Sequence, residues 1–146
     1  MASILEVRDS SHIYSVGTPF QRAAIEHVSF SVERGEFIGV IGHTGSGKST
    51  LIQHLNGLLQ PSEGEVLLDG KSIWDAKGKC SRETRFRVGL VFQYPEYQLF
   101  EETIAKDIAY GPTNMKLPQA EIDERVRESM AAVGLAPELA DQSPFA

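Results

Sequence analysis

Cysteine and long hydrophobic runs are scarce in this sequence of 146 residues. The single cysteine, Cys80, has no disulfide partner in the chain and lies in the polar stretch KGKCSRETR, which favours a reducing compartment and argues against a metal role. No apolar run approaches the roughly 20 residues that a membrane helix needs, and the N-terminal stretch MASILEVRDS lacks the pattern of a secretory signal. We therefore expect a soluble, cytoplasmic protein that could still dock onto a membrane protein.

Basic residues are also few and scattered. The sequence has 14 Lys and Arg against 20 Asp and Glu, a formal net charge of -6, and its nearest approach to a basic cluster is Arg82, Arg85 and Arg87. Because a nucleic-acid surface normally shows a basic stripe, nucleic acid is not an expected partner. The length is that of one domain, near the lower limit for a sheet covered by helices on both sides.

Apolar patterns predict strands in four places. Residues 4–7 and 25–32 alternate between apolar and polar side chains, as strands with one buried face do. Residues 37–41 (FIGVI) and 88–92 (VGLVF) are continuously apolar, which suits strands buried on both faces. Asp69-Gly70 lies between two further apolar runs and predicts a hairpin turn with positive φ at both residues.

Three helices are predicted. The first begins at Ser49, where apolar residues recur at helical spacing in STLIQHLNGLL. The second contains Ile104 and Ile108, begins after the capping residue Thr103, and is expected to stop at Gly111-Pro112. The third runs from about 118 to 133 and ends at Gly134. Its apolar face is expected to consist of Ile122, Val126, Met130 and Val133.

Residues 42–50, GHTGSGKST, match the phosphate-binding pattern GxxxxGK[ST] through Gly42, Gly47, Lys48 and Ser49. Glycines let the backbone curl so that N–H groups and the positive end of the next helix hold phosphate oxygens. Lys48 is expected to reach the β and γ phosphates, Ser49 to ligate Mg²⁺, and Thr50 to contact the α phosphate. The other residues of the predicted nucleotide site are His43, Thr44, Gly45 and Ser46. His43 is expected to face solvent rather than to act in catalysis.

A phosphate-binding loop alone does not distinguish between three classes of protein: a GTPase, a kinase, and an ATPase that powers a larger assembly. The sequence has no NKxD-type segment to read guanine, and its one DxxG match, residues 75–78, lies in a polar stretch. GTPases and small kinases also usually begin at the phosphate loop, whereas here the loop begins only at Gly42. A soluble P-loop kinase or GTPase remains an alternative.

The segments around the loop resemble the nucleotide-binding subunit of an ABC transporter. Tyr14, in the expected loop after the first strand, matches the aromatic that stacks on adenine in this family, and Gln93, at the end of VGLVF, matches the Q-loop glutamine that touches Mg²⁺ and the γ phosphate. Three segments resemble more narrowly an energy-coupling factor transporter ATP-binding protein, the second of two paralogous ATPases: GTPF, GHTGSGKSTLIQHLNGLLQPSEGEV and VFQYPEYQLFEETIAKDIAYGP.

The resemblance implies an α/β fold, the N-terminal part of an ABC-type P-loop NTPase with an antiparallel β subdomain. Residues 1–93 would form the nucleotide-binding core portion, and residues 94–146 the Q-loop and helical subdomain portion. ATP and Mg²⁺ are the implied cofactors, with Ser49 and Gln93 as metal ligands.

The implied partners are a paralogous ATPase paired head to tail, a transmembrane coupling protein and a substrate-binding membrane protein that selects the vitamin or metal. The coupling protein's helices would dock on the segment from Tyr94 to about Pro112. These partners place the protein at the inner face of the cell membrane.

Later family motifs are missing from the sequence. An LSGGQ-type signature, a Walker B strand ending in Asp-Glu, a D-loop and a switch histidine are all absent, and Asp69, the nearest Walker B mimic, is followed by Gly70. We therefore expect no catalytic residue within this chain, which would hold Mg-ATP without hydrolysing it. The full-length parent would be an ATPase driving micronutrient uptake, and a non-hydrolysing nucleotide-binding fragment is the other alternative. The missing strands are also expected to leave VGLVF or its neighbour as an unpaired apolar edge.

Overall fold

The computed structural model describes residues 3–146, which form two compact units. One unit ends at Leu90 and the other begins at Val91. Each unit has its own cluster of buried apolar side chains. Within the described residues, no helix has both the length and the apolar character needed to cross a bilayer.

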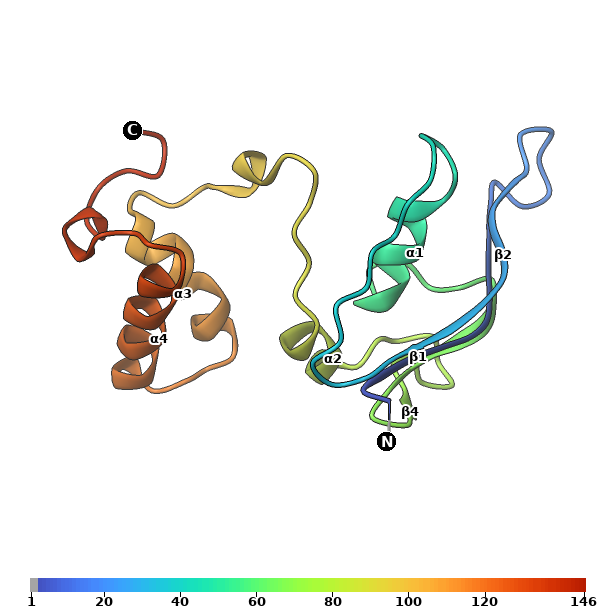
Figure 1. The fold of residues 1–146 in the computed structure, drawn as a ribbon, viewed down its shortest axis with the longest axis horizontal. Coiled ribbons are helices and arrows are strands. Elements are labelled where there is room, and N and C mark those ends of the chain that lie inside the picture. Colours follow the sequence, from blue (N-terminus) through green and yellow to red (C-terminus); the bar gives the residue numbers. More distant parts are fainter. Residues whose placement is uncertain (1–2) are drawn as a thin grey trace. The chain divides into compact units, whose positions relative to one another are not determined.

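The first unit is built on a four-stranded antiparallel sheet with the order β2-β1-β3-β4 (Figure 1). The strands are β1 (Leu5–Tyr14), β2 (Arg22–Val32), β3 (Glu63–Leu68) and β4 (Lys71–Ser72). Helix α1 (Lys48–Leu55) packs against β1 and β2, and a short helix α2 (Arg82–Arg87) follows β4. The centre of the core consists of Val7, Val66, Leu68 and Ile73.

The turn between β3 and β4 confirms the predicted hairpin. Asp69 has φ 48° and Gly70 has φ 78°, so both turn residues adopt the left-handed conformation that a type I′ turn requires. The Asp69 carboxylate is engaged by Arg87 at 2.5 Å and by Arg34 at 3.7 Å. Asp69 therefore has a structural role: its backbone forms the turn, and its carboxylate pairs with two arginines.

Strand β1 extends well beyond the predicted residues 4–7 because a bulge carries the pairing through a polar stretch. The register with β2 and with β3 shifts next to Asp9, which has φ 48°. Serine hydroxyls replace ladder bonds there: Asp9 N donates to Ser29 Oγ at 2.8 Å, and His27 N donates to Ser11 Oγ at 2.9 Å. Polar residues therefore continue the strand where the alternation of apolar side chains stops.

The prediction of strands at residues 37–41 and 88–92 was wrong. Neither segment is hydrogen-bonded as a strand, and Phe37, Ile41 and Val91 are 97%, 96% and 80% exposed. A strand buried on both faces needs neighbours that pair with its edges and helices that cover its faces. The described residues contain no strand that pairs with either segment. Both segments are thus unpaired apolar stretches. An unpaired apolar edge was expected at VGLVF or its neighbour.

The second unit is helical. Its elements are the 3-10 turn η1 (Pro95–Gln98), α3 (Ile104–Asn114), α4 (Gln119–Ala132) and the 3-10 turn η2 (Pro137–Leu139). As predicted, Thr103 caps α3, its hydroxyl accepting from Lys106 N at 3.2 Å. The buried side chains of α4 are Ile122, Val126 and Met130.

Two details of these helices differ from the prediction. Helix α3 continues through Gly111-Pro112 to Asn114, because a proline near the C-terminus removes only one intrahelical donor and Met115 N still bonds Gly111 O at 3.1 Å. Val133 is 72% exposed, because the helix ends there in a Schellman motif. In that motif Gly134 N donates to Ala131 O and Leu135 N to Met130 O, so Leu135 packs on the core instead.

The close approach of β3 to the bulge predicts a large penalty for a side chain at Gly64. Gly64 has φ 82°, and a Cβ there would lie 2.2 Å from Asp9 O. Gly70 has a similar φ of 78° but open space around it, so Gly70→Ala is a matched control. We expect Gly70→Ala to lower the free energy of unfolding by about 1 kcal/mol and Gly64→Ala by about 3 kcal/mol, measured by urea unfolding. Equal losses for the two variants would contradict the close packing at the bulge.

Candidate functional site

The phosphate-binding pattern forms a tight loop between β2 and α1 in the chain. Ser46 N donates to His43 O at 3.1 Å, and Gly45 and Gly47 adopt φ values of 83° and 96°. A Cβ on Gly47 would lie only 2.4 Å from Ala24 O on β2. Glycine is therefore required at position 47 both by the backbone conformation and by the contact with the sheet.

The first turn of α1 presents donors that the helix itself cannot satisfy. The cap residue Gly47 provides no side-chain hydrogen bond, and the turn contains no acidic residue. The first N–H groups of a helix lack intrahelical acceptors, and the helix dipole makes this end positive. This end of α1 is consequently suited to an anion such as a phosphate group.

Lys48 lies across the mouth of the loop. Its ammonium group donates to Gly42 O at 2.5 Å, to His43 O at 2.8 Å and to Ser46 Oγ at 3.2 Å. A phosphate oxygen entering the loop would exchange with these acceptors while keeping the positive charge beside it. A Cβ on Gly42 would lie 2.6 Å from Ser46 Oγ, so glycine also keeps this part of the loop open. The residues present therefore fit a polyphosphate.

Ser49 and Thr50 differ in their surroundings. Ser49 is exposed in the first turn of α1, where its hydroxyl is free to meet a metal ion, whereas Thr50 is buried. The Thr50 hydroxyl shares a hydrogen bond of 3.0 Å with the Tyr14 hydroxyl. If the Thr50 hydroxyl contacts the α phosphate, it must do so while it also bonds the Tyr14 hydroxyl. His43 and Thr44, the variable positions of the loop, are exposed.

Tyr14 is the last residue of β1, which corrects the prediction that it lies in the loop after the strand. The bulge explains the difference, because it extends the strand. Tyr14 is paired in register with Arg22 of β2, and Arg22 reaches the phosphate loop by donating to Gly45 O at 3.2 Å. Tyr14 is 40% exposed and so offers a surface to a ligand next to the loop.

Polar side chains that the sequence did not single out connect β1 to α1. His54 Nε2 lies 3.0 Å from His12 Nδ1, and His54 Nδ1 lies 3.2 Å from Ser10 Oγ. The only available signals were the spacings: Tyr14 is two positions after His12 on a strand, and His54 is four positions after Thr50 on a helix. Such spacings place side chains on one face but do not show that the faces meet.

Gln93 belongs to the second unit, whereas the loop belongs to the first. Its side chain is exposed. Its contact with Mg²⁺ and the γ phosphate stays a prediction.

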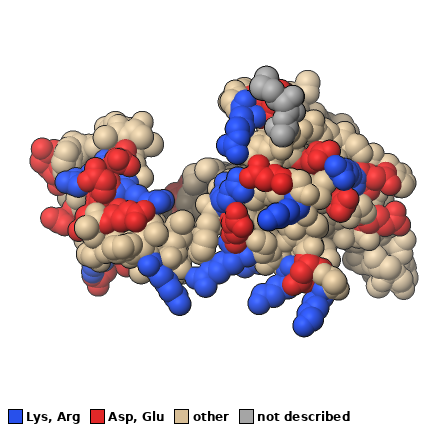
Figure 2. Space-filling view, turned by 90° about the horizontal axis from the view of Figure 1, so that it is seen from below, with Lys and Arg blue, Asp and Glu red and all other residues tan. Residues whose placement is uncertain are grey.

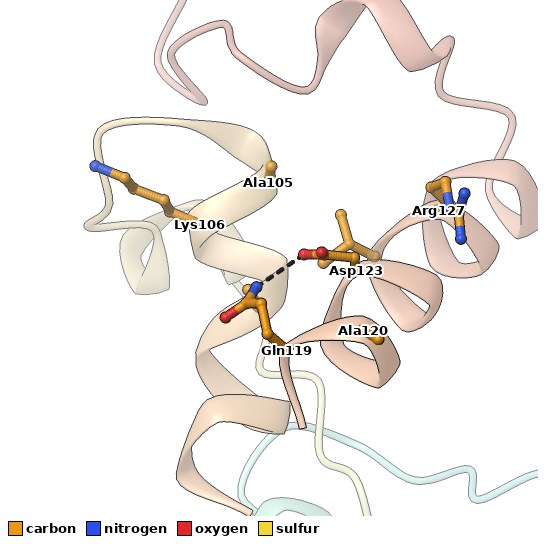
Figure 3. Close-up of a pocket in the computed structure, with 8 residues that line it drawn as sticks. Ala105, Lys106, Gln119, Ala120, Asp123 and Arg127 are labelled. Carbon is orange, nitrogen blue, oxygen red and sulfur yellow. Dashed lines mark hydrogen bonds between the residues drawn. The ribbon is translucent and has the colours of Figure 1, made fainter. Parts of the chain in front are cut away.

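A hollow of about 540 Å³ lies between α3 and α4 in the second unit (Figure 3). Small side chains line much of it, and Figure 3 shows Lys106 extending away from Asp123. Its charged side chains are already paired: Lys106 with Glu102, Asp123 with Gln119, and Arg127 with Glu124. The hollow is therefore less suited to a phosphate than the loop at the start of α1.

Charged side chains of both signs are mixed on the surface. On the face shown in Figure 2, Lys and Arg lie among Asp and Glu rather than in one continuous stripe. Several are ion pairs within one element, such as Arg8 with Glu6 and Arg125 with Glu121. This pattern differs from the basic stripe that binds nucleic acid.

Comparison with known proteins identifies the family. A protein-family model described as ABC transporter matches residues 25–144. The chain belongs to the ABC transporter family. An ABC relative from Caldanaerobacter subterraneus subsp. tengcongensis, described as energy-coupling factor transporter ATP-binding protein EcfA2, is 55% identical over 141 residues. That match covers 97% of this chain and 49% of the relative, so the chain spans about half the length of this curated relative.

Solved ABC structures share the fold. CbiO1 from Clostridium perfringens, described as part of the ABC transporter complex CbiONQ, has a TM-score of 0.79 at 38% identity, covering 98% of this chain and 55% of that one. A dimeric ATP-binding cassette bound to ADP and Pi has a TM-score of 0.76 at 23% identity, covering 97% of this chain and 62% of that one, and supports the fold alone. These matches confirm the predicted ABC ATPase fold class.

The buried histidine of this ABC chain predicts a loss of stability in acid. Burial, and to a lesser extent the His12 ring, lower the pKa of His54 from 6.5 to about 4. Between these pH values the unfolded chain binds a proton on His54 that the folded chain does not bind, so unfolding is favoured as the pH falls. The stability that neutral His54 contributes is present above pH 6.5 and is lost as the pH falls toward 4. We expect a lower urea midpoint at about pH 5 than at about pH 7.

His54→Gln should show a smaller decrease over this range, because it removes the titrating group. His27→Gln is the control: His27 is exposed and Asp9 raises its pKa, so its removal should leave the decrease unchanged or enlarge it. The same pH dependence in wild type and His54→Gln would contradict the assignment to His54.

Proposed function

We propose that this chain supplies the ATP-binding part of the ATPase subunit of an energy-coupling factor transporter, which couples ATP binding and hydrolysis to uptake of vitamins or other micronutrients. The observation that carries the proposal is the cradle formed by the loop and the uncapped first turn of α1, with Lys48 across it. The likeness to EcfA2 supports the choice of transporter class.

Each part of the cradle has a role in holding Mg-ATP. The first-turn N–H groups of α1 and the loop backbone bind phosphate oxygens, and Lys48 moves its ammonium group from loop carbonyls to the β and γ phosphates. Ser49 offers its hydroxyl to Mg²⁺, which neutralises phosphate charge when bound. Tyr14 stacks its exposed ring on adenine. Gln93 supplies the remaining contact to Mg²⁺ and the γ phosphate.

Residues 1–146 by themselves hold Mg-ATP without hydrolysing it in this proposal. Phosphoryl transfer depends on a carboxylate that orients water and on groups that stabilise the developing charge. The Asp69 carboxylate, the nearest candidate in sequence, is engaged by Arg87 and Arg34 at the β3–β4 turn. Hydrolysis therefore requires groups outside these residues, including those of a paralogous ATPase paired head to tail.

Removing the lysine of the cradle should weaken nucleotide binding. We expect Lys48→Ala to lower the affinity for Mg-ATP about tenfold to a hundredfold, because charge-assisted hydrogen bonds to phosphate are lost. Lys71→Ala, at an exposed lysine of the short strand β4, is the matched control and should bind as wild type does. Isothermal titration with Mg-ATP measures both affinities.

Three outcomes would count against the proposal. Unchanged affinity in Lys48→Ala would exclude the cradle as the nucleotide site. A preference for GTP over ATP, or phosphorylation of a small acceptor, would favour a soluble P-loop GTPase or kinase. ATP binding without turnover, persisting when the paralogous ATPase is added to the whole protein, would favour a non-hydrolysing nucleotide-binding protein.

The second unit supplies the proposed docking surface for a transmembrane coupling protein, at the cytoplasmic face of the membrane. Exposed aromatic side chains gather in the segment from 94 to 112, in two edge-to-face pairs. The pairs are Tyr94 with Tyr97, at 6.0 Å between ring centroids, and Phe100 with Tyr110, at 4.9 Å. Exposed aromatic groups of this kind are enriched at protein interfaces. The substrate-binding membrane protein of such a transporter would select the cargo.

The most exposed of these aromatic side chains provides a test of the docking surface. Tyr97 is 84% exposed, so Tyr97→Ser should leave the fold intact and lower the affinity for the coupling protein about tenfold. Val133→Ser, an exposed apolar position at the end of α4, is the matched control. Both affinities can be measured by titration against the coupling protein in detergent. Equal binding by wild type and Tyr97→Ser would argue for a different docking surface.

A further inference from the structure

Three side-chain hydrogen bonds join strand β1 to helix α1 beside the phosphate loop, and two of them involve Tyr14 and His12 of β1. Tyr14 and His12 alternate along β1 and therefore share a face, and Thr50 and His54 are one turn apart on α1. Tyr14 meets Thr50 through their hydroxyls at 3.0 Å, and His12 meets His54 through ring nitrogens at 3.0 Å. The strand that carries the proposed adenine-stacking ring is thus attached to the helix that carries the phosphate site.

The hydrogen-bond partners of the two histidines assign their protons. His12 Nδ1 lies 3.2 Å from Gln60 O, a carbonyl that can only accept, so this nitrogen carries the proton. The same N–H is shared, in a three-centre bond, with His54 Nε2, which then accepts. The proton of neutral His54 is then on Nδ1, directed at Ser10 Oγ 3.2 Å away. Every ring nitrogen in this contact has a compatible partner.

The position of His12 is therefore fixed from the interior of the unit. His54 and Ser10 are both fully buried, whereas Tyr14 at the end of the same strand is 40% exposed. The His12 ring meets the Tyr14 ring edge to face, with 4.5 Å between centroids. The exposed Tyr14 ring is consequently held at two points, by Thr50 at its hydroxyl and by His12 at its ring.

We propose that His12 and His54 are positioning residues for nucleotide recognition, which hold the Tyr14 ring in the orientation that stacks on the base. This inference rests on the proposed function, since it assumes that ATP binds at the cradle. A ring that is already immobilised loses less conformational entropy when a base stacks on it. Neither histidine has a hydrogen bond to the phosphate loop, so they contribute to base binding and not to phosphate binding.

The test compares two ligands that share the phosphates but not the base. Affinities for Mg-ATP and for inorganic triphosphate with Mg²⁺ are measured on the protein expressed from its complete gene. We expect His12→Ala to lower the affinity for ATP about three- to tenfold while the affinity for triphosphate is unchanged. His27→Ala, which removes an exposed histidine of β2, is the matched control and should change neither affinity.

Three results would overturn the inference. Unchanged ATP affinity in His12→Ala would show that the Tyr14 ring needs no support, and equal losses for both ligands would show a general structural role. Both results leave the proposed function intact if wild type binds both ligands and Lys48→Ala loses both. If wild type binds neither ligand, the proposed function and this inference fail together.

A second variant keeps the test valid if His12→Ala does not fold. His12→Asn retains an N–H near the position of Nδ1, for Gln60 and His54, but has no ring to hold Tyr14. The same selective loss of ATP affinity is expected, and its absence in a folded His12→Asn protein would overturn the inference.

Discussion

The contact between Gly47 and strand β2 is the constraint on which the candidate site depends. The left-handed backbone at Gly47 starts α1, and the absence of a side chain lets this turn lie against Ala24 O. Two residues earlier on β2, Arg22 bonds the loop at Gly45 O. One strand therefore fixes both the loop and the first turn of the helix. The direction of the first N–H groups, and with it the phosphate site, follows from this packing.

Phosphate binding and partner binding are assigned to different units. The cradle, Tyr14 and their supports lie in the first unit, with its sheet and its own core. The aromatic docking segment lies in the second, where α4 supplies the buried side chains of a separate core. Gln93, near the start of the second unit, is the one proposed nucleotide ligand outside the first.

Local rules made much of this structure predictable. The Asp69-Gly70 turn, the Thr103 cap and the helix end at Gly134 depend on backbone conformations and hydrogen bonds within a few residues, so the sequence carries their signals directly. The phosphate loop is likewise a contiguous pattern, and Gly47, one of its two fixed glycines, has the left-handed conformation that starts α1.

The features that escaped prediction depend on distant residues. Residues 37–41 and 88–92 have the composition of buried strands, but a strand exists only where another pairs with it. Arg22, His12 and His54 were missed because each acts through a contact between separate elements. The place of Tyr14 in the strand was missed because serine side chains, rather than an apolar pattern, carry β1 past its bulge.

The bulge at Asp9 also determines which face of the sheet each later side chain of β1 lies on. Val7 faces the core that includes Leu55 of α1, and without an extra residue the alternation would bring 9, 11 and 13 to the same face. The additional residue at Asp9 changes the parity, so that Ser10, His12 and Tyr14 face α1 instead. The alternation of side chains in the part of β1 after Asp9 is thus offset by one residue from the alternation before it. In evolution, a single-residue insertion or deletion at this point would replace Ser10, His12 and Tyr14 on the face toward α1 while leaving Val7 on the core face.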